Sequence, residues 1–172
     1  DNTVESERTA VVTVTMGSIV REIAVKQAAY SEQPSVAAPT VVGLDGIVLN
    51  ASNTVNSSSK VALNIQAEAG VDKLEVEIIS EVLTADVLLD MGLPPKFDLA
   101  SPGDLEPTLG ADGFGFPVGD EVKNNTGVIN FDVSSFMGLL SALGEAEHTF
   151  RLTVTDNLGQ VTNADLILNV VK

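Results

Sequence analysis

Alternation of apolar and polar residues is the strongest pattern in this chain, and it predicts β-strands. The clearest case is residues 148–171, HTFRLTVTDNLGQVTNADLILNVV, in which two alternating runs flank the turn Asp156-Asn157-Leu158-Gly159. A period of two places successive side chains on opposite faces of a strand, so each run has one face for a core and one for water. The segment therefore predicts a long closing hairpin.

The same pattern predicts four more strands, in residues 41–50, 60–69, 73–79 and 128–133. In the last three of them one face is mainly apolar and the other mainly polar, as in antiparallel sheets with one face in water. The stretch Gly70-Val71-Asp72 is short enough to join residues 60–69 and 73–79 into a second hairpin.

Two stretches depart from alternation and predict short helices. The first is SEVLTADVLLDMGLPP, residues 80–95, capped near Ser80 or Thr84. The second is SSFMGLLSALG, residues 134–144, with Ser134 or Ser135 as its N-cap and Gly144 just beyond its last turn. The first helix opens a long excursion, residues 80–121, that is rich in Gly, Pro and Asp. A connection of this length holds irregular structure of its own or is functional.

The N-terminal residues predict a separate hairpin. Apolar residues alternate before and after the turn Met16-Gly17-Ser18, and a two-stranded hairpin needs a further surface to lie against. Residues 28–39 follow, punctuated by Pro34 and Pro39, and have the composition of a linker. We therefore expect three parts: a hairpin in 1–27 from a truncated upstream β domain, a linker in 28–39, and a domain in 40–172 with a long insertion at 80–121.

About six strands and two short helices within residues 40–172 favour an all-β fold, an antiparallel immunoglobulin-like β-sandwich with helices in its crossovers. An alternating parallel layout would need more helices than the pattern provides. The 44% hydrophobic content of the 172-residue chain is enough for such a core.

Composition narrows the function. The net charge of −15 would repel phosphate backbones and anionic lipid surfaces, which argues against nucleic-acid and direct membrane binding. The chain has no Cys, which excludes disulfides and thiolate chemistry. No apolar run approaches the roughly 20 residues that span a bilayer. The first residue is Asp1 and not Met, so we expect that a leader has been removed.

Catalytic chemistry finds little support in the sequence. His148 is the single histidine, and no nucleophile or triad spacing accompanies it, so we expect it to be an ordinary residue near a strand end. Carboxylate pairs for glycoside cleavage are uninformative in so acidic a chain. We therefore predict a protein that is not an enzyme and has no cofactor except, in one interpretation, calcium.

Calcium is the metal that the acidic, Gly-rich excursion suits best, because it prefers hard oxygen ligands. The spacing does not fit the EF-hand loop, and Asp and Gly also serve ordinary turns, so both interpretations stay open. A second candidate is the closing turn at Asp156 and Asn157. The candidate ligands within the excursion are Asp98, Asp104, Glu106, Asp112 and Asp120.

Sugar recognition on a β surface uses exposed aromatic rings beside polar side chains. The chain has six Phe, one Tyr and no Trp, so candidates are few. The alternative for the three Phe of the excursion is that they anchor it onto the sheet, and the alternative for Asn124-Asn125-Thr126 is a turn. The candidate ligand-binding residues are Phe97, Phe114, Phe116, Asn124 and Asn125.

Residues 1–27 resemble the C-terminal end of a BACON domain, a family of Bacteroidetes associated with carbohydrate binding. The resemblance rests on Asn2, Arg8-Thr9-Ala10, the Thr/Val strand 11–15, Gly17 and Val25-Lys26-Gln27. Residues 40–172 resemble the immunoglobulin-like or PKD-like modules of surface lipoproteins from the same bacteria. That resemblance rests on AEAGVDKLEVEIIS, FDLASPGD and GEAEHTFRLTVTDNLGQVT.

These resemblances imply a secreted or outer-membrane surface protein that is held to the membrane only by a lipid anchor outside this chain. They favour adhesion or presentation, with a glycan or a cell-surface protein as partner and contact made by the excursion. A carbohydrate-binding protein of a glycan-uptake system and an inert spacer are the two alternatives. For the N-terminal hairpin, docking within one molecule and exchange between molecules both stay open.

Overall fold

The structure, a computed structural model, describes residues 7–27 and 35–172. The chain divides into two compact units, Asp1–Ser35 and Val36–Lys172. Asn2 and the part of the expected linker in residues 28–34 lie outside the described residues.

The first unit contains the predicted N-terminal hairpin. Strands β1 (Arg8–Met16) and β2 (Ile19–Gln27) pair antiparallel, with Met16 opposite Ile19 and Gly17 at a φ of 62° in the turn. The described residues of this unit are exposed on both faces of the hairpin. This hairpin therefore has no buried core of its own.

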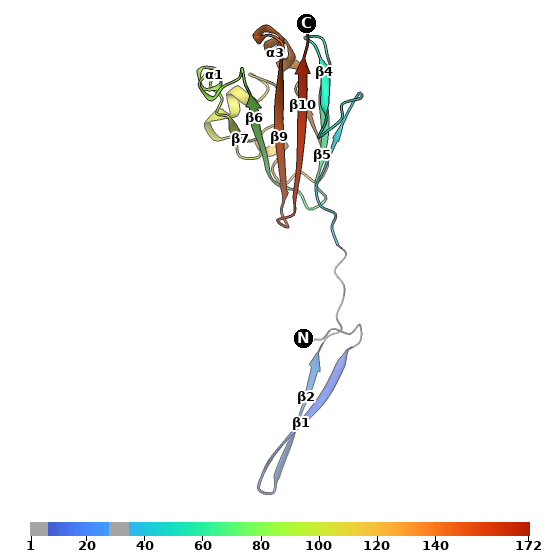
Figure 1. Ribbon diagram of the computed structural model, residues 1–172. Helices are drawn as coiled ribbons and strands as arrows, with labels where there is room; N and C mark the ends of the chain where they lie inside the picture. Colours follow the sequence, from blue (N-terminus) through green and yellow to red (C-terminus); the bar gives the residue numbers. More distant parts are fainter. Residues whose placement is uncertain (1–6, 28–34) are drawn as a thin grey trace. The chain divides into compact units, whose positions relative to one another are not determined.

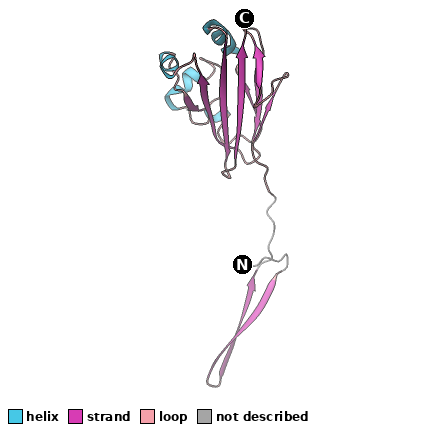
Figure 2. Ribbon diagram, in the orientation of Figure 1, coloured by secondary structure: helices cyan, strands magenta, loops and turns pink. Residues whose placement is uncertain are grey.

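The second unit is a sandwich of two sheets (Figures 1 and 2). The larger sheet has the order β4 (Ser52–Val55), β10 (Val161–Val170), β9 (Ala146–Asp156), β6 (Val71–Ser80) and β7 (Lys96–Asp98). The smaller sheet has the order β3 (Thr40–Gly43), β5 (Ala62–Gln66) and β8 (Val128–Asp132).

Short helices fill the connections between strands. Figure 1 shows α1 beside β6 and β7, and α3 near the ends of β9 and β10 that lie by the C-terminus. The excursion between β6 and β8 contains α1 (Ala85–Asp90), β7, η1 (Gly103–Leu105), α2 (Glu106–Leu109) and η2 (Gly119–Glu121). The crossover from β8 to β9 contains η3 (Ser134–Phe136) and α3 (Met137–Leu143).

The core lies between the two sheets and is apolar. Its largest fully buried side chains include Phe131, Phe136 and Phe150, which come from β8, η3 and β9. The inward faces of residues 60–69, 73–79 and 128–133 are buried as their alternation predicts. Each fully buried Leu, Ile or Phe contributes roughly 1.5–3 kcal/mol relative to exposure, so the core is the main stabilising element of this unit.

The strand order is that of an immunoglobulin-like sandwich, which confirms the predicted fold class. The arrangement β3-β5-β8 corresponds to strands A, B and E, and β10-β9-β6-β7 corresponds to G, F, C and C′. Strand β4 is the continuation of A after it changes sheets, and it pairs with β10 in parallel. The other strand pairs of this unit are antiparallel, and strand alternation does not encode the direction of this one pair.

Two further predictions were wrong in detail. Residues 60–69 and 73–79 do not form a hairpin, because β5 and β6 belong to different sheets and the chain crosses the sandwich at Gly70. Of the strand expected in 41–50 only the first residues form one, as part of β3, and turns follow; β4, at Ser52–Val55, was not predicted. Both sheets bury one face on the same core, so alternation alone does not reveal which sheet a strand joins.

The helix predictions were closer. Thr84 caps α1 through its side chain, which accepts a hydrogen bond from the Val87 N–H at 3.4 Å. Gly144 ends α3 at a φ of 108°, as expected. Neither Ser134 nor Ser135 caps α3 with its side chain. The Ser134 hydroxyl accepts a hydrogen bond from the Val61 N–H instead, which ties the start of the crossover to β5.

In the two described ranges of the chain, no helix is long and apolar enough to cross a bilayer.

Candidate functional site

The excursion is fastened to the larger sheet by backbone pairing and by one carboxylate. In β7, Phe97 lies opposite Val76 of β6. Asp98 Oδ1 accepts hydrogen bonds from the Leu74 and Ala100 N–H groups, at 3.1 and 2.9 Å. A carboxylate that satisfies two backbone donors holds this corner in place. Asp98 therefore has a structural role, which is to hold the base of the excursion against β6.

The loop after α2 is tightly folded. The Phe114 and Phe116 N–H groups donate to the carbonyls of Thr108 and Leu109, at 2.9 and 2.8 Å. The Gly119 N–H donates to the Leu99 carbonyl at 2.8 Å, which returns the chain to the excursion's base. These hydrogen bonds fix the conformation of residues 108–119, so the segment is an ordered loop.

Two of the three predicted aromatic contact residues are buried. Phe97 and Phe116 are only 5% and 4% exposed, and Phe114 is half-buried against the core. The Phe114 ring centroid lies 5.9 Å from that of Phe116 and 5.0 Å from that of Phe136. The Phe116 centroid lies 5.0 Å from that of Phe131. The rings anchor the excursion onto the sandwich, which is one of the two interpretations given above, and Phe97 and Phe116 form no exposed platform.

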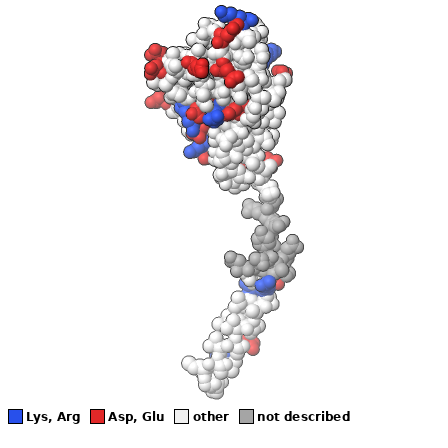
Figure 3. All heavy atoms as spheres, viewed as in Figure 1, with Lys and Arg blue, Asp and Glu red and all other residues white. Residues whose placement is uncertain are grey.

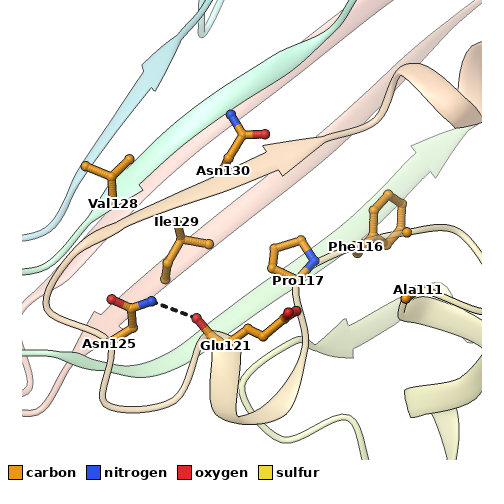
Figure 4. Close-up of a pocket in the computed structure, with 9 residues that line it drawn as sticks. Ala111, Phe116, Pro117, Glu121, Asn125, Val128, Ile129 and Asn130 are labelled. Atoms are coloured by element: carbon orange, nitrogen blue, oxygen red, sulfur yellow. Dashed lines mark hydrogen bonds between the residues drawn. The ribbon is translucent and has the colours of Figure 1, made fainter.

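A hollow of about 380 Å³ lies where this anchored loop meets β8. Figure 4 shows Val128, Ile129 and Asn130 of β8 on one side, and Phe116, Pro117 and Glu121 of the excursion on the other. Asn125 stands at its end. Its Nδ2 donates to the Glu121 carbonyl at 2.7 Å, and its Oδ1 accepts from the Gly127 N–H at 2.7 Å. Polar and apolar residues therefore both line this hollow.

Of the predicted ligand-binding residues, Phe116 and Asn125 line this hollow, and Asn124 does not. Asn124 adopts a φ of 59° and donates its N–H to the Val71 carbonyl at 2.7 Å. Its side-chain Oδ1 accepts from Asn157 Nδ2 at 3.2 Å. Asn124 thus ties the end of the excursion to the larger sheet, as in the alternative interpretation of a turn, and its assignment to ligand binding stays a prediction.

Three of the expected calcium ligands, Glu106, Asp112 and Asp120, line one hollow, but Asp98 and Asp104 do not. Asp98 is used by the backbone, and Asp104 lies in η1. Within residues 7–27 and 35–172, no group of three or more His, Cys, Asp or Glu side chains is placed to hold a metal ion. The closing turn is no better, because both Asp156 carboxylate oxygens already accept hydrogen bonds within it.

Acidic side chains nevertheless gather around a second hollow, of about 450 Å³, next to the first. The two hollows share Ala111 and Glu121. None of the described residues that line them is Lys or Arg. The side chains of this second hollow that carry negative charge are Glu106, Asp112, Asp120 and Glu121.

His148 is not the strand-edge residue that the sequence suggested. It points into the core from β9, is fully buried, and neither ring nitrogen has a hydrogen-bond partner among the described residues. Burial lowers the pKa of His148, because an imidazolium would lose its hydration. The side chain faces no cleft. It acts as a neutral core residue.

Comparison with known proteins supplies no relative. No family model, curated protein or solved structure matched the chain.

Sequence reasoning missed seven of the nine residues that line the hollow, among them Glu121, Val128 and Asn130. The strand prediction for 128–133 had placed Val128 and Asn130 on the solvent side, which the structure confirms. What the pattern could not show is that β8 lies at an edge of its sheet. The available signal was the lack of strand alternation between residues 99 and 127.

Proposed function

We propose that the chain is a non-enzymatic contact module, for adhesion or presentation, of a bacterial cell-envelope protein. The observation that carries the proposal is the hollow between β8 and the excursion, built on a rigid sandwich and lined by Glu121, Asn125 and Asn130. A bare sandwich does not need this excursion, and binding residues are commonly held on such loops by a rigid scaffold. The resemblance to Bacteroidetes surface lipoproteins supports the envelope location, outside the membrane and held by a lipid anchor elsewhere.

Carbohydrate recognition is the second candidate, because amide and carboxylate groups in the hollow suit hydroxyl ligands. The burial of Phe116 leaves little aromatic face for a sugar ring, which weakens this candidate relative to protein contact. An inert spacer is the third, and it predicts that the hollow has no partner.

Filling the hollow tests the proposal. Ala111 is exposed and lines both hollows, so Ala111→Trp places a large side chain in them. Ala142→Trp is the matched control, because Ala142 is exposed on α3 and lines neither. Beads coated with the full chain would be measured for retention on glycan arrays and on bacterial and host cell surfaces.

The proposal expects retention that Ala111→Trp lowers about tenfold and Ala142→Trp leaves unchanged. Retention on glycans alone would favour the carbohydrate-binding candidate. An absence of retention on every surface, or equal retention of both variants, would contradict a contact role for the hollow and favour the spacer.

A further inference from the structure

Strand β8 offers an open sheet edge to the hollow. The Val133 N–H donates to the Val61 carbonyl at 2.9 Å, which makes this a hydrogen-bonded pair of the antiparallel ladder. Such pairs alternate with non-bonded ones, and Asn130 lies opposite Asn64 at an odd number of steps from Val133. The backbone N–H and C=O of Asn130, and likewise those of Val128, therefore point away from β5.

The pairing of β5 with its other neighbour, β3, leads to the same alternation of hydrogen-bonded and non-bonded pairs. The Leu44 N–H donates to the Ala62 carbonyl at 2.9 Å, so the backbone groups of Ala62 face β3. Ala62 lies opposite Asp132, which is then also in a non-bonded pair with β5. Among the hydrogen bonds of the described residues, none uses the backbone of Val128 or Asn130 on the outer side. The edge is unpaired where it borders the hollow.

The acidic residues around this edge favour a positively charged partner. Glu121 lies in both hollows, and Glu106, Asp112 and Asp120 extend the acidic surface beyond it. Residues 36–172 contain nineteen acidic and six basic residues, a net charge of −13. Figure 3 shows acidic side chains outnumbering basic ones on the face of this unit that it displays. A cationic partner is attracted at long range and neutralises the hollow on contact.

We propose that the hollow receives an extended, basic peptide segment that adds to β8 as a further strand of the three-stranded sheet. The backbone of the segment would pair with Val128 and Asn130, and its Lys or Arg side chains would lie against Glu121 and the adjoining acidic hollow. Strand addition draws affinity from main-chain hydrogen bonds and specificity from pockets for alternate side chains. The proposal deepens the contact function given above and rests on it for its biological role.

The test uses the full chain and a defined probe. The probe is the peptide Ac-Thr-Lys-Val-Lys-Thr-Lys-Val-NH2, compared with a counterpart in which Glu replaces each Lys. Binding would be followed by titration calorimetry and by backbone amide shifts of the ¹⁵N-labelled chain. The expected result is binding of the Lys peptide, with shifts centred on Val128 and Asn130, and no binding of the Glu peptide. Equal binding of both peptides, or shifts elsewhere, would overturn the proposal.

Two peptides with N-methyl groups on alternate residues, in opposite registers, separate strand addition from simple charge attraction. Only the N–H groups along one edge of an added strand point toward β8. The peptide that is methylated at those N–H groups should therefore lose binding, and the peptide methylated at the others should keep it. Equal effects of the two registers, whether both peptides bind or both fail, would show that the backbone is not paired.

Variants locate the site on the protein. Asn130→Pro removes the outward N–H, which does not serve the ladder with β5, and Pro is accepted at strand edges of this kind. We expect at least a tenfold loss of binding from Asn130→Pro and about a fivefold loss from Glu121→Gln. Glu81→Gln is the control, since Glu81 is an exposed acid that lines a different hollow. A loss with Glu81→Gln equal to that with Glu121→Gln would overturn the assignment.

The two proposals fail separately. Adhesion that Ala111→Trp abolishes, together with a Lys peptide that does not bind, would keep the contact function and end the strand-addition proposal. Peptide binding at β8 without adhesion to any surface would do the reverse.

Discussion

His148 is a residue whose cost to stability depends on pH. Both ring nitrogens are buried without a hydrogen-bond partner in the described chain, and burial lowers the pKa of the imidazole. The unfolded chain takes up a proton near the ordinary pKa of about 6.5, whereas the folded chain resists it. Stability is therefore retained above pH 6.5 and lost as the pH falls toward the lower pKa of the folded state.

We expect His148→Leu to unfold at a higher temperature than the parent and to have a flatter pH dependence. The parent should lose up to about 1.4 kcal/mol per pH unit below pH 6.5 from this residue alone. Thermal unfolding of both proteins between pH 7.5 and 5 measures the difference. Carboxylates titrate in both, so parallel curves would mean that His148 is not the group responsible.

Among the described residues, Asp156 is the other buried polar side chain, and its hydrogen bonds are made. Its Oδ1 accepts from the Leu158 and Gln160 N–H groups at 2.9 and 2.8 Å, and its Oδ2 accepts from Gln160 Nε2 at 3.0 Å. Asp156→Ala leaves these donors without that partner, so we expect a loss of about 2–3 kcal/mol in the free energy of unfolding. Leu158→Ala in the same turn, at an exposed position, should change it by less than about 0.5 kcal/mol. Urea unfolding compares the two, and equal effects would contradict the argument.

At the scale of elements, the excursion depends on a close approach of the backbone at Gly113. A Cβ at Gly113 would overlap the Thr108 carbonyl, which accepts the Phe114 N–H. Gly113→Ala must push apart the loop that carries Phe114 and Phe116, so we expect a loss of about 1–3 kcal/mol in unfolding free energy. The same change should weaken binding at the hollow.

Gly138→Ala is the opposite case within α3. It has nothing within 4 Å of an added Cβ, and Ala favours helix over Gly, so a gain of up to about 1 kcal/mol is expected. Chemical denaturation of both Ala variants checks the contrasting signs. A stabilised Gly113→Ala protein would show that the loop is looser than its hydrogen bonds indicate.

The elements were more predictable than their connections. Alternation identified the strands 60–69, 73–79, 128–133 and the closing hairpin, because a half-buried strand imposes that pattern on its residues. It could not assign β5 and β6 to different sheets, since both face the same core. The candidate site was less predictable still. The sequence does not show whether a Phe in a loop packs into the core or stays exposed to bind a ligand. In the structure, Phe97 and Phe116 are buried.

The roles of the polar candidates could not be predicted for a similar reason. Asp98 and Asn124 make hydrogen bonds to backbone groups. These bonds depend on contacts between segments that are far apart in the sequence. Glu121 and Asn130 became candidates only when the edge position of β8 was known.

At the scale of the molecule, the two units differ in how they are stabilised. The buried core residues of the described chain all lie in the second unit, from Val55 to Val170, whereas large apolar side chains of β1 and β2 are exposed. A two-stranded hairpin is marginal in water. We therefore expect rapid amide exchange throughout β1 and β2, with strong protection in β6, β9 and β10, as measured by hydrogen–deuterium exchange of the full chain. Equal protection in both units would show that the hairpin has a partner in solution.

The parallel pair at the sandwich edge has a consequence for how this protein is made. Ser52 of β4 lies opposite Ile167 of β10, and Val55 opposite Val170, so the partners are about 115 residues apart in the chain. Contacts of such long range slow folding, typically to milliseconds or seconds in all-β domains. A ribosome synthesises β10 last of all the described strands, and β4 has to wait for it. The sandwich is therefore completed only after its final strand has been synthesised, and a nascent chain stopped before residue 161 would leave both β4 and the outer side of β9 unpaired.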